Sequence, residues 1–304
     1  RSATKSDLSL LKNLEKNMQK RVFGQDKAIT SIVQAIKINK AGLGLDKKPI
    51  GSFLFTGPTG VGKTEVAKEL SLQMGIHFER FDMSEYMEAH AVSRLIGAPA
   101  GYIGFEQGGL LTESIRKHPH TVLLLDEIEK AHPDLMSILL QVMDNAELTD
   151  NSGNKADFQN VILIMTSNLG VSEANVMGFA KNEKLNESKA INKFFAPEFR
   201  NRLDAVVSFD SLSLDVVSKV AGKFIEDLEK QLENKKIKIE ISRKAKDELA
   251  KLGYDKAMGA RPLNRVISQK VKNPLTDEIL FGKLKKGGVV KIDFKEDFVF
   301  TYSL

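Results

Sequence analysis

Cysteine is absent from the sequence, which excludes disulfide cross-links and thiol catalysis. Any zinc site would have to use histidine and carboxylates alone. Long apolar runs are also missing: none approaches the roughly 20 residues that a transmembrane helix needs, and no apolar leader opens the sequence. We therefore expect a globular protein of the cytoplasm that does not enter a membrane.

A large charge excess is missing as well, at least over the first two thirds of the chain. The net charge of +5 arises after Ser208, because basic and acidic residues balance before it. In the last third the two signs alternate along helical stretches such as Glu226–Lys230, which is typical of a solvated helix face. The sequence therefore gives little support to a nucleic-acid-binding surface.

The chain is long enough for two domains, since 304 residues exceed what one hydrophobic core usually organises. Helical spacing of apolar residues covers 8–40, with an interruption at Gly24. Short apolar runs then alternate with helical patterns at 65–74 and 133–143, which predicts βαβ units and a parallel sheet. The five strands predicted for an α/β domain over 1–208 are 52–56, 76–81, 121–125, 161–166 and 205–209.

Beyond Phe209 the pattern changes to that of a smaller C-terminal α+β domain, 209–304. Two polar stretches, 1–6 and 181–189, are predicted to be a linker and a mobile surface loop, respectively. The elements predicted for the second domain are a helix near 213–234, a strand at 237–241, helices to 280 and a β pair at 289–294 and 298–303.

One segment carries a phosphate-binding pattern, GxxxxGK[ST], between the first strand and a helix. Its glycines let backbone N–H groups surround phosphate oxygens at a helix N-terminus. Lys63 would neutralise the β- and γ-phosphates, and the Thr64 hydroxyl would reach Mg²⁺. The predicted nucleotide-binding residues are Gly57, Pro58, Thr59, Gly60, Val61, Gly62, Lys63 and Thr64.

Polar residues follow two further strands. Asp126 and Glu127 end the apolar run at 121–125, and Asn168 closely follows the run at 161–166. Carboxyl ends of parallel strands share one edge of a sheet, so these side chains should lie beside the phosphate loop. Asp126 would then hold Mg²⁺, Glu127 would polarise the attacking water, and Asn168 would orient that water against the γ-phosphate.

These motifs occur in the order found in AAA+ ATPases, and they resemble the Clp unfoldases in particular. The runs 80–88 (RFDMSEYME) and 93–99 (SRLIGAP) are similar to the second ATPase module of ClpA. The likeness extends from about Val22 onward. ClpA also has an N-terminal domain and a first ATPase module, so this chain resembles a fragment of such a protein.

The resemblance implies roles that spacing alone does not. Arg202 would be the finger that reaches the γ-phosphate of a neighbouring subunit, with Arg200 as the alternative. Arg261 would be the phosphate sensor of the small domain. Val22 and Phe23 would line the adenine pocket, although plain core packing is an equal reading for both. The implied ligands are ATP or ADP and Mg²⁺.

The resemblance also implies contacts with proteins. An aromatic residue flanked by glycines, at Gly101, Tyr102, Ile103 and Gly104, would line a central pore and grip a translocating polypeptide. Residues 147–157 would form a second pore loop. The tripeptide Met177, Gly178 and Phe179 matches the aliphatic-Gly-aromatic element that docks on the ClpP peptidase, although Ile or Leu is usual at its first position.

Taken together, the motifs and the resemblance to Clp unfoldases imply a module that assembles into a hexameric ring, hydrolyses ATP and threads unfolded or tagged proteins, with or without adaptor proteins, into a ClpP-type peptidase. One alternative is a disaggregase of the ClpB type that works without a peptidase. Another is a nucleotide-gated binding module with little hydrolysis, and Glu127, Asn168 and Arg202 together argue against it. A nucleic-acid motor is the weakest alternative, because neither a recognition helix nor an aromatic and basic groove is evident.

Overall fold

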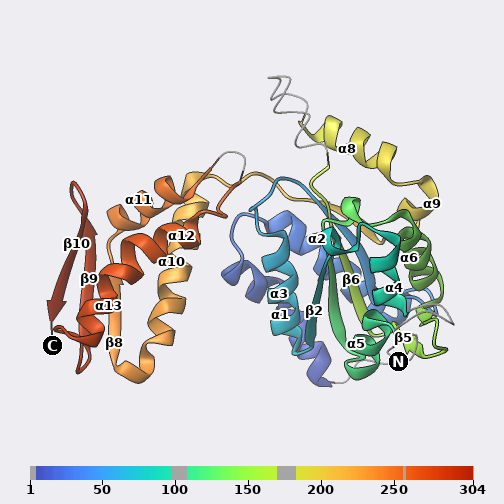
Figure 1. The fold of residues 1–304 in the computed structure, drawn as a ribbon, viewed down its shortest axis with the longest axis horizontal. Coiled ribbons are helices and arrows are strands. Elements are labelled where there is room, and N and C mark those ends of the chain that lie inside the picture. The colour runs from blue at the N-terminus through green and yellow to red at the C-terminus, as the bar shows by residue number, and fades with distance from the viewer. Residues whose placement is uncertain (1–4, 98–107, 170–182, 256–257, 304) are drawn as a thin grey trace. The chain divides into compact units, whose positions relative to one another are not determined.

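The computed structural model describes residues 5–97, 108–169, 183–255 and 258–303 (Figure 1). The chain divides into two compact units. The first comprises Arg1–Gly57 and Gly62–Phe209, and the second comprises Pro58–Val61 and Asp210–Leu304. We describe each unit by itself.

The first unit contains a five-stranded, all-parallel sheet with strand order β2-β3-β6-β1-β7. The predicted α/β fold with a five-stranded parallel sheet is therefore confirmed. β1 and β6 are buried along their whole length, which explains why they read as unbroken apolar runs. The strands are β1 (Gly51–Thr56), β2 (His77–Asp82), β3 (Thr121–Asp126), β6 (Val161–Thr166) and β7 (Ala205–Ser208).

Helices cover both faces of this sheet (Figure 1). On one face, α1 (Lys5–Arg21) and α2 (Asp26–Ile38) pack with α3 (Lys63–Met74). On the other face, α4 (Ala89–Ile96), α5 (Leu110–Lys117) and α6 (Pro133–Asn145) enclose a fully apolar core. That core joins Leu54, Leu123 and Leu163 of three neighbouring strands to the helices, so it holds the carboxyl ends of the strands in a fixed frame.

Two predictions about polar segments are wrong. The predicted loop at 181–189 lies largely within α8 (Glu183–Phe194), which short α9 (Pro197–Arg200) follows. Although α8 is polar, Ile191 and the adjacent Phe195 are buried in the core, and Glu187 accepts a hydrogen bond from Ser208. Tertiary packing thus stabilises a helix whose composition alone favoured a loop. The predicted linker at 1–6 is also too long, since α1 begins at Lys5.

A small antiparallel hairpin, β4 (Glu147–Thr149) with β5 (Lys155–Asp157), occupies the segment predicted to be a second pore loop. Its turn is organised by Asp150, whose buried carboxylate accepts hydrogen bonds from Ser152, Asn154 and Thr112. The hairpin is therefore an ordered structural element, and its contact with a translocating chain stays a prediction.

The second unit has its own three-stranded sheet, ordered β10-β9-β8, in which β8 is parallel and β10 antiparallel to β9. Alternate residues of β8, such as Ile237 and Ile239, are buried, which gives the period-two pattern seen in the sequence. The elements are α10 (Leu214–Gln231), β8 (Ile237–Ile241), α11 (Arg243–Gly253), α12 (Leu263–Ile267), α13 (Asn273–Leu280), β9 (Gly288–Phe294) and β10 (Phe298–Ser303).

Across both units, none of the helices in the described ranges combines the length and apolar character needed to cross a bilayer.

Candidate active site

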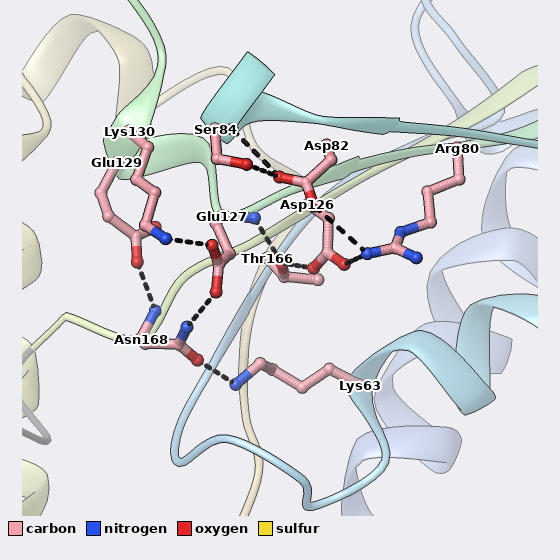
Figure 2. Close-up of polar contacts among 10 residues, drawn as sticks. All are labelled: Lys63, Arg80, Asp82, Ser84, Asp126, Glu127, Glu129, Lys130, Thr166 and Asn168. Atoms are coloured by element: carbon pink, nitrogen blue, oxygen red, sulfur yellow. Dashed lines mark hydrogen bonds and ion pairs between the residues drawn. The ribbon is translucent and has the colours of Figure 1, made fainter. Parts of the chain in front are cut away.

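The candidate site lies where three adjacent strands end. β6 lies between β3 and β1 in the sheet, so Asn168, just after β6, is flanked by Asp126 at the end of β3 and by the loop that follows β1. Figure 2 shows Lys63, Asp126, Glu127 and Asn168 converging at this edge. The sequence prediction that these four side chains meet agrees with this arrangement.

The loop after β1 has a backbone that only glycine adopts freely. Gly57 and Gly62 have φ of 125° and 105°. A Cβ at Gly57 would lie 2.3 Å from the carbonyl oxygen of Phe209, so a side chain there is excluded. α3 follows at once, and no side chain caps its N-terminus. The first N–H groups of a helix have no partners within the helix, so this end suits the phosphates of a nucleotide.

Lys63, the first residue of α3, is buried and points to the strand ends. Its Nζ donates to the Gly57 carbonyl oxygen at 2.6 Å and to Oδ1 of Asn168 at 2.8 Å. Burial lowers the pKa of Lys63 from 10.5 to about 8, although nearby carboxylates, led by Glu129, oppose the change. The lysine is therefore charged at neutral pH but close to its titration range.

Asn168 connects the lysine to a carboxylate. Its Nδ2 lies 3.3 Å from Oε1 of Glu127, while its backbone N–H donates to Oε1 of Glu129 at 2.9 Å. The cation on one side and the carboxylate on the other fix the orientation of the amide, with oxygen toward Lys63 and nitrogen toward Glu127. A change at Lys63 can therefore reach Glu127 through one side chain.

Glu127 is held in a strained conformation. Its φ of 58° and ψ of 54° place it in the left-handed region, which costs a residue other than glycine about 1–2 kcal/mol. Its backbone N–H donates to the Thr166 hydroxyl, and its Oε2 pairs with Lys130. These contacts keep a carboxylate at the site in an otherwise unfavourable backbone geometry.

Asp126 makes two contacts that the sequence did not predict. The Thr166 hydroxyl accepts from the Glu127 N–H, so its one hydrogen is donated to Oδ1 of Asp126. Oδ2 of Asp126 lies 2.7 Å from Nη2 of Arg80, which is two residues before the end of β2 (Figure 2). The site residues that sequence reasoning missed are Arg80, Thr166, Glu129 and Lys130. Alternation along β2, which puts Arg80 and Asp82 on one face beside the end of β3, could have indicated the first of them.

The residues present fit Mg²⁺. The Thr64 hydroxyl is on the second residue of α3, and the Asp126 carboxylate ends the strand next but one to β1. Hydroxyl, carboxylate and phosphate oxygens are the donors that Mg²⁺ prefers. Thr64 and Asp126 would therefore hold the ion together with a nucleotide.

Comparisons with known proteins agree with this site. Residues 48–206 match the family described as AAA domain (Cdc48 subfamily), and 212–292 match the C-terminal, D2-small domain of ClpB protein. The chain belongs to the AAA family. It is 55% identical to the ClpA homolog protein of Fuscovulum blasticum over 98% of this chain and 38% of that protein.

The Clp relatives narrow the family further. Chaperone proteins ClpB of Enterococcus faecalis and Bdellovibrio bacteriovorus are 48% and 47% identical over 90% and 94% of this chain. The chain covers 32% and 34% of these two proteins, so it spans about a third of its relatives' length. It is a nucleotide-binding AAA+ module of the Clp family and an ATPase, as the sequence predicted.

Arg202 lies near the amino ends of the strands, whereas the nucleotide site of the module lies at their carboxyl ends. Two residues later, Asp204 bonds to Ser52 at the start of β1, through both its backbone N–H and its carboxylate. The phosphate loop follows the other end of β1, and a six-residue strand is about 20 Å long. Arg202 pairs with Asp144 at 3.0 Å, whereas Arg200 is held by Asn192 and the Phe195 carbonyl.

The roles of the other predicted residues stay predictions. Val22 is buried and Phe23 is partly buried, both between α1 and α2. Arg261 is exposed in the turn before α12 of the second unit, so its contact with a nucleotide stays a prediction. The residues Gly101, Tyr102, Ile103, Gly104, Met177, Gly178 and Phe179 lie outside the described residues.

Nucleotide affinity is expected to fall above about pH 8. Phosphate binding favours charged Lys63, whose pKa in the free module is about 8, so affinity should be flat below that pH. Above it, affinity should decline by up to about tenfold per pH unit until the higher pKa of the bound state is reached. Titration of a fluorescent ADP derivative between pH 7 and 9.5 measures this decline. Lys63→Arg, which stays charged, should bind with a flat profile; the same decline in that variant would show that another group titrates.

Proposed function

We propose that the chain is the ATP-hydrolysing part of a ring-shaped protein unfoldase, which threads unfolded or tagged proteins into a ClpP-type peptidase. Residues 1–208 would form the ATPase domain, and 209–304 its smaller lid domain. The observation that carries the proposal is the continuous path from Lys63 through Asn168 to Glu127 at three neighbouring strand ends. A binding module without turnover has no need for a carboxylate held under backbone strain beside the phosphate loop.

In binding, the loop Gly57–Thr64 and the N-terminal N–H groups of α3 receive the phosphates. Lys63, already buried and charged, exchanges its contacts with Gly57 and Asn168 for phosphate oxygens at little cost in desolvation. Val22 and Phe23 would pack against the base. Bound Mg²⁺ neutralises phosphate charge in this type of reaction.

In hydrolysis, Glu127 accepts a proton from the attacking water, and Asn168 orients that water and the carboxylate. The side-chain amide of Asn168 connects the position of Lys63 to that of Glu127. When Lys63 turns to phosphate, Oδ1 of Asn168 loses its donor and becomes available to the water, while Nδ2 still holds Glu127. Lys130 pairs with the other oxygen of Glu127 and so helps to hold the carboxylate in place.

In the assembly, hydrolysis requires a second subunit. Arg202 is too far from its own phosphate loop and would act on the γ-phosphate of a neighbour in a hexameric ring. Arg261 would link the nucleotide to the angle of the lid. Tyr102, with Gly101, Ile103 and Gly104, would grip the substrate in the pore. We further propose that the protein works in the cytoplasm. It would use protein adaptors and would bind neither nucleic acid nor membranes.

The second candidate is a disaggregase that works without a peptidase. It is favoured by the match of 212–292 to a ClpB domain and by the ClpB relatives. The ClpA homolog, at 55% identity, and the tripeptide Met177–Phe179 favour the peptidase-coupled function. The two candidates share the ATPase site and differ in whether that tripeptide docks on a partner.

Unfolding of a tagged fluorescent protein, measured with and without ClpP, tests both candidates. Tyr102→Ala should leave ATP hydrolysis within about twofold and stop both unfolding and degradation, since the motor no longer grips its substrate. Deletion of Met177–Phe179 should preserve hydrolysis and unfolding but reduce degradation more than about tenfold, because each apolar side chain buried in a partner contributes about 1.5–3 kcal/mol. Normal degradation after the deletion would favour the disaggregase.

A further inference from the structure

Arg80 is a site residue for which the proposed reaction supplies no role. It is on β2, the edge strand beside β3, and its side chain runs along the carboxyl edge of the sheet to Asp126 (Figure 2). The side chain is 44% exposed, so it does not fill the core. The register between β2 and β3 is already fixed by backbone pairing from His77 to Asp82. The role of Arg80 therefore lies in its contact with Asp126, and the packing of the sheet does not depend on its side chain.

Both carboxylate oxygens of Asp126 already have partners. Oδ1 is taken by the Thr166 hydroxyl, which has no other hydrogen to give. Oδ2 is occupied by Arg80, and the carboxylate as a whole is only 14% exposed. Arg80 thus compensates a largely buried negative charge at the carboxylate that would serve the divalent cation.

Arg80 has a second carboxylate within reach. Oδ2 of Asp82 lies 3.6 Å from the same Nη2 that contacts Asp126. Oδ1 of Asp82 accepts from both the N–H and the hydroxyl of Ser84, and these hydrogen bonds lower the pKa of Asp82. Asp82 therefore stays ionised and presents its other oxygen to the guanidinium, which can move between the two acids without entering the core.

We propose that Arg80 is an internal counter-ion: it holds Asp126 while the site contains no divalent cation and transfers to Asp82 when Mg²⁺ binds with nucleotide. Arg80 is then a positioning residue that competes with the metal. It raises the Mg²⁺ concentration that the site needs, and it disfavours metal binding before a nucleotide is present. The inference rests on the proposed nucleotide site and adds the control of its metal.

A Mg²⁺ titration of fluorescent ADP binding tests the exchange, with ATP turnover left aside. Arg80→Gln should lower the half-saturating Mg²⁺ concentration by about fivefold or more, because the competitor is gone. The same variant should bind Mn²⁺ without nucleotide more tightly than the parent chain, as measured by electron paramagnetic resonance. Arg116→Gln, which removes the same charge from an exposed position of α5, should change neither value.

Asp82→Asn should have the opposite effect. With its second acceptor weakened, Arg80 stays on Asp126 and the half-saturating Mg²⁺ concentration rises. If Asp82 acts through Arg80, the double variant Arg80→Gln/Asp82→Asn should match Arg80→Gln alone. Thermal melts check that each variant is folded.

The outcomes separate the possible failures. Absence of ADP binding by the parent chain would overturn the proposed nucleotide site itself. Normal ADP binding with an unchanged or raised Mg²⁺ requirement in folded Arg80→Gln would show that Arg80 only anchors Asp126. An equal effect of Asp82→Asn with and without Arg80 would show that the two charges act independently and that no transfer occurs.

Discussion

Glu127→Gln is expected to bind ATP within about twofold of the parent affinity and to hydrolyse it at least about 100 times more slowly. The substitution keeps the shape of the side chain and an oxygen for Nδ2 of Asn168. It removes the charge that accepts a proton from water, and this charge has no role in holding phosphates. Nucleotide titration and phosphate release measure the two steps separately.

The matched comparison is Lys63→Ala, which should lose binding by about 100-fold or more, since hydrogen bonds to charged groups contribute about 1.5–3 kcal/mol each. Lys68→Ala, at an exposed position of the same helix, should bind normally. Normal turnover by Glu127→Gln would remove Glu127 from the mechanism. Loss of binding by that variant would instead mean that the charge of Glu127 holds its strained turn, with φ of 58°, and so maintains the shape of the site.

Elements whose structure is determined by neighbouring residues in the chain could be predicted from the sequence. β1 and β6 are buried along their whole length, so an apolar run bounded by turn residues was sufficient to find them. The phosphate loop follows from glycines that a tight turn requires, and Asp126 and Asn168 follow from their places at strand ends. In these cases the physical cause lies within about ten residues of the chain.

Contacts set by strand order were not predicted. Arg80 reaches Asp126 only because β2 pairs with β3, and Thr166 bridges Asp126 and Glu127 only because β6 is on the other side of β3. The helix α8 was missed for a related reason, since its stability comes from Ile191 and the core it contacts. A single sequence does not contain these pairings until the order of the strands is known.

The position of Arg202 predicts a second large loss of ATP hydrolysis, which depends on contact between two subunits. Arg202→Ala should reduce ATP hydrolysis in assembled rings by about 1,000-fold, the effect typical of an arginine that stabilises the transferring phosphate. Nucleotide binding by a single subunit should be unchanged, because Arg202 lies near the amino end of β1 and the phosphate loop of the same subunit follows its carboxyl end. Loss of its pairs with Asp144 and Glu198 should affect stability little, since Asp144 and Glu198 are exposed and Arg202 is only partly buried, and ion pairs at the surface contribute little.

Mixing two inactive variants then tests the action between subunits. In rings assembled from equal amounts of Arg202→Ala and Glu127→Gln chains, about a quarter of the interfaces should combine an intact Glu127 with an intact Arg202 from the neighbour. ATP hydrolysis should return to about that fraction of the parent rate, with subunit exchange followed by fluorescence transfer between labelled chains. A mixture of Glu127→Gln with the double variant Arg202→Ala/Glu127→Gln has no such interface and should stay inactive. If labelled subunits exchange and the first mixture is still inactive, Arg202 does not act on a neighbour, and the same experiment with Arg200→Ala would show whether the arginine held by α8 does so instead.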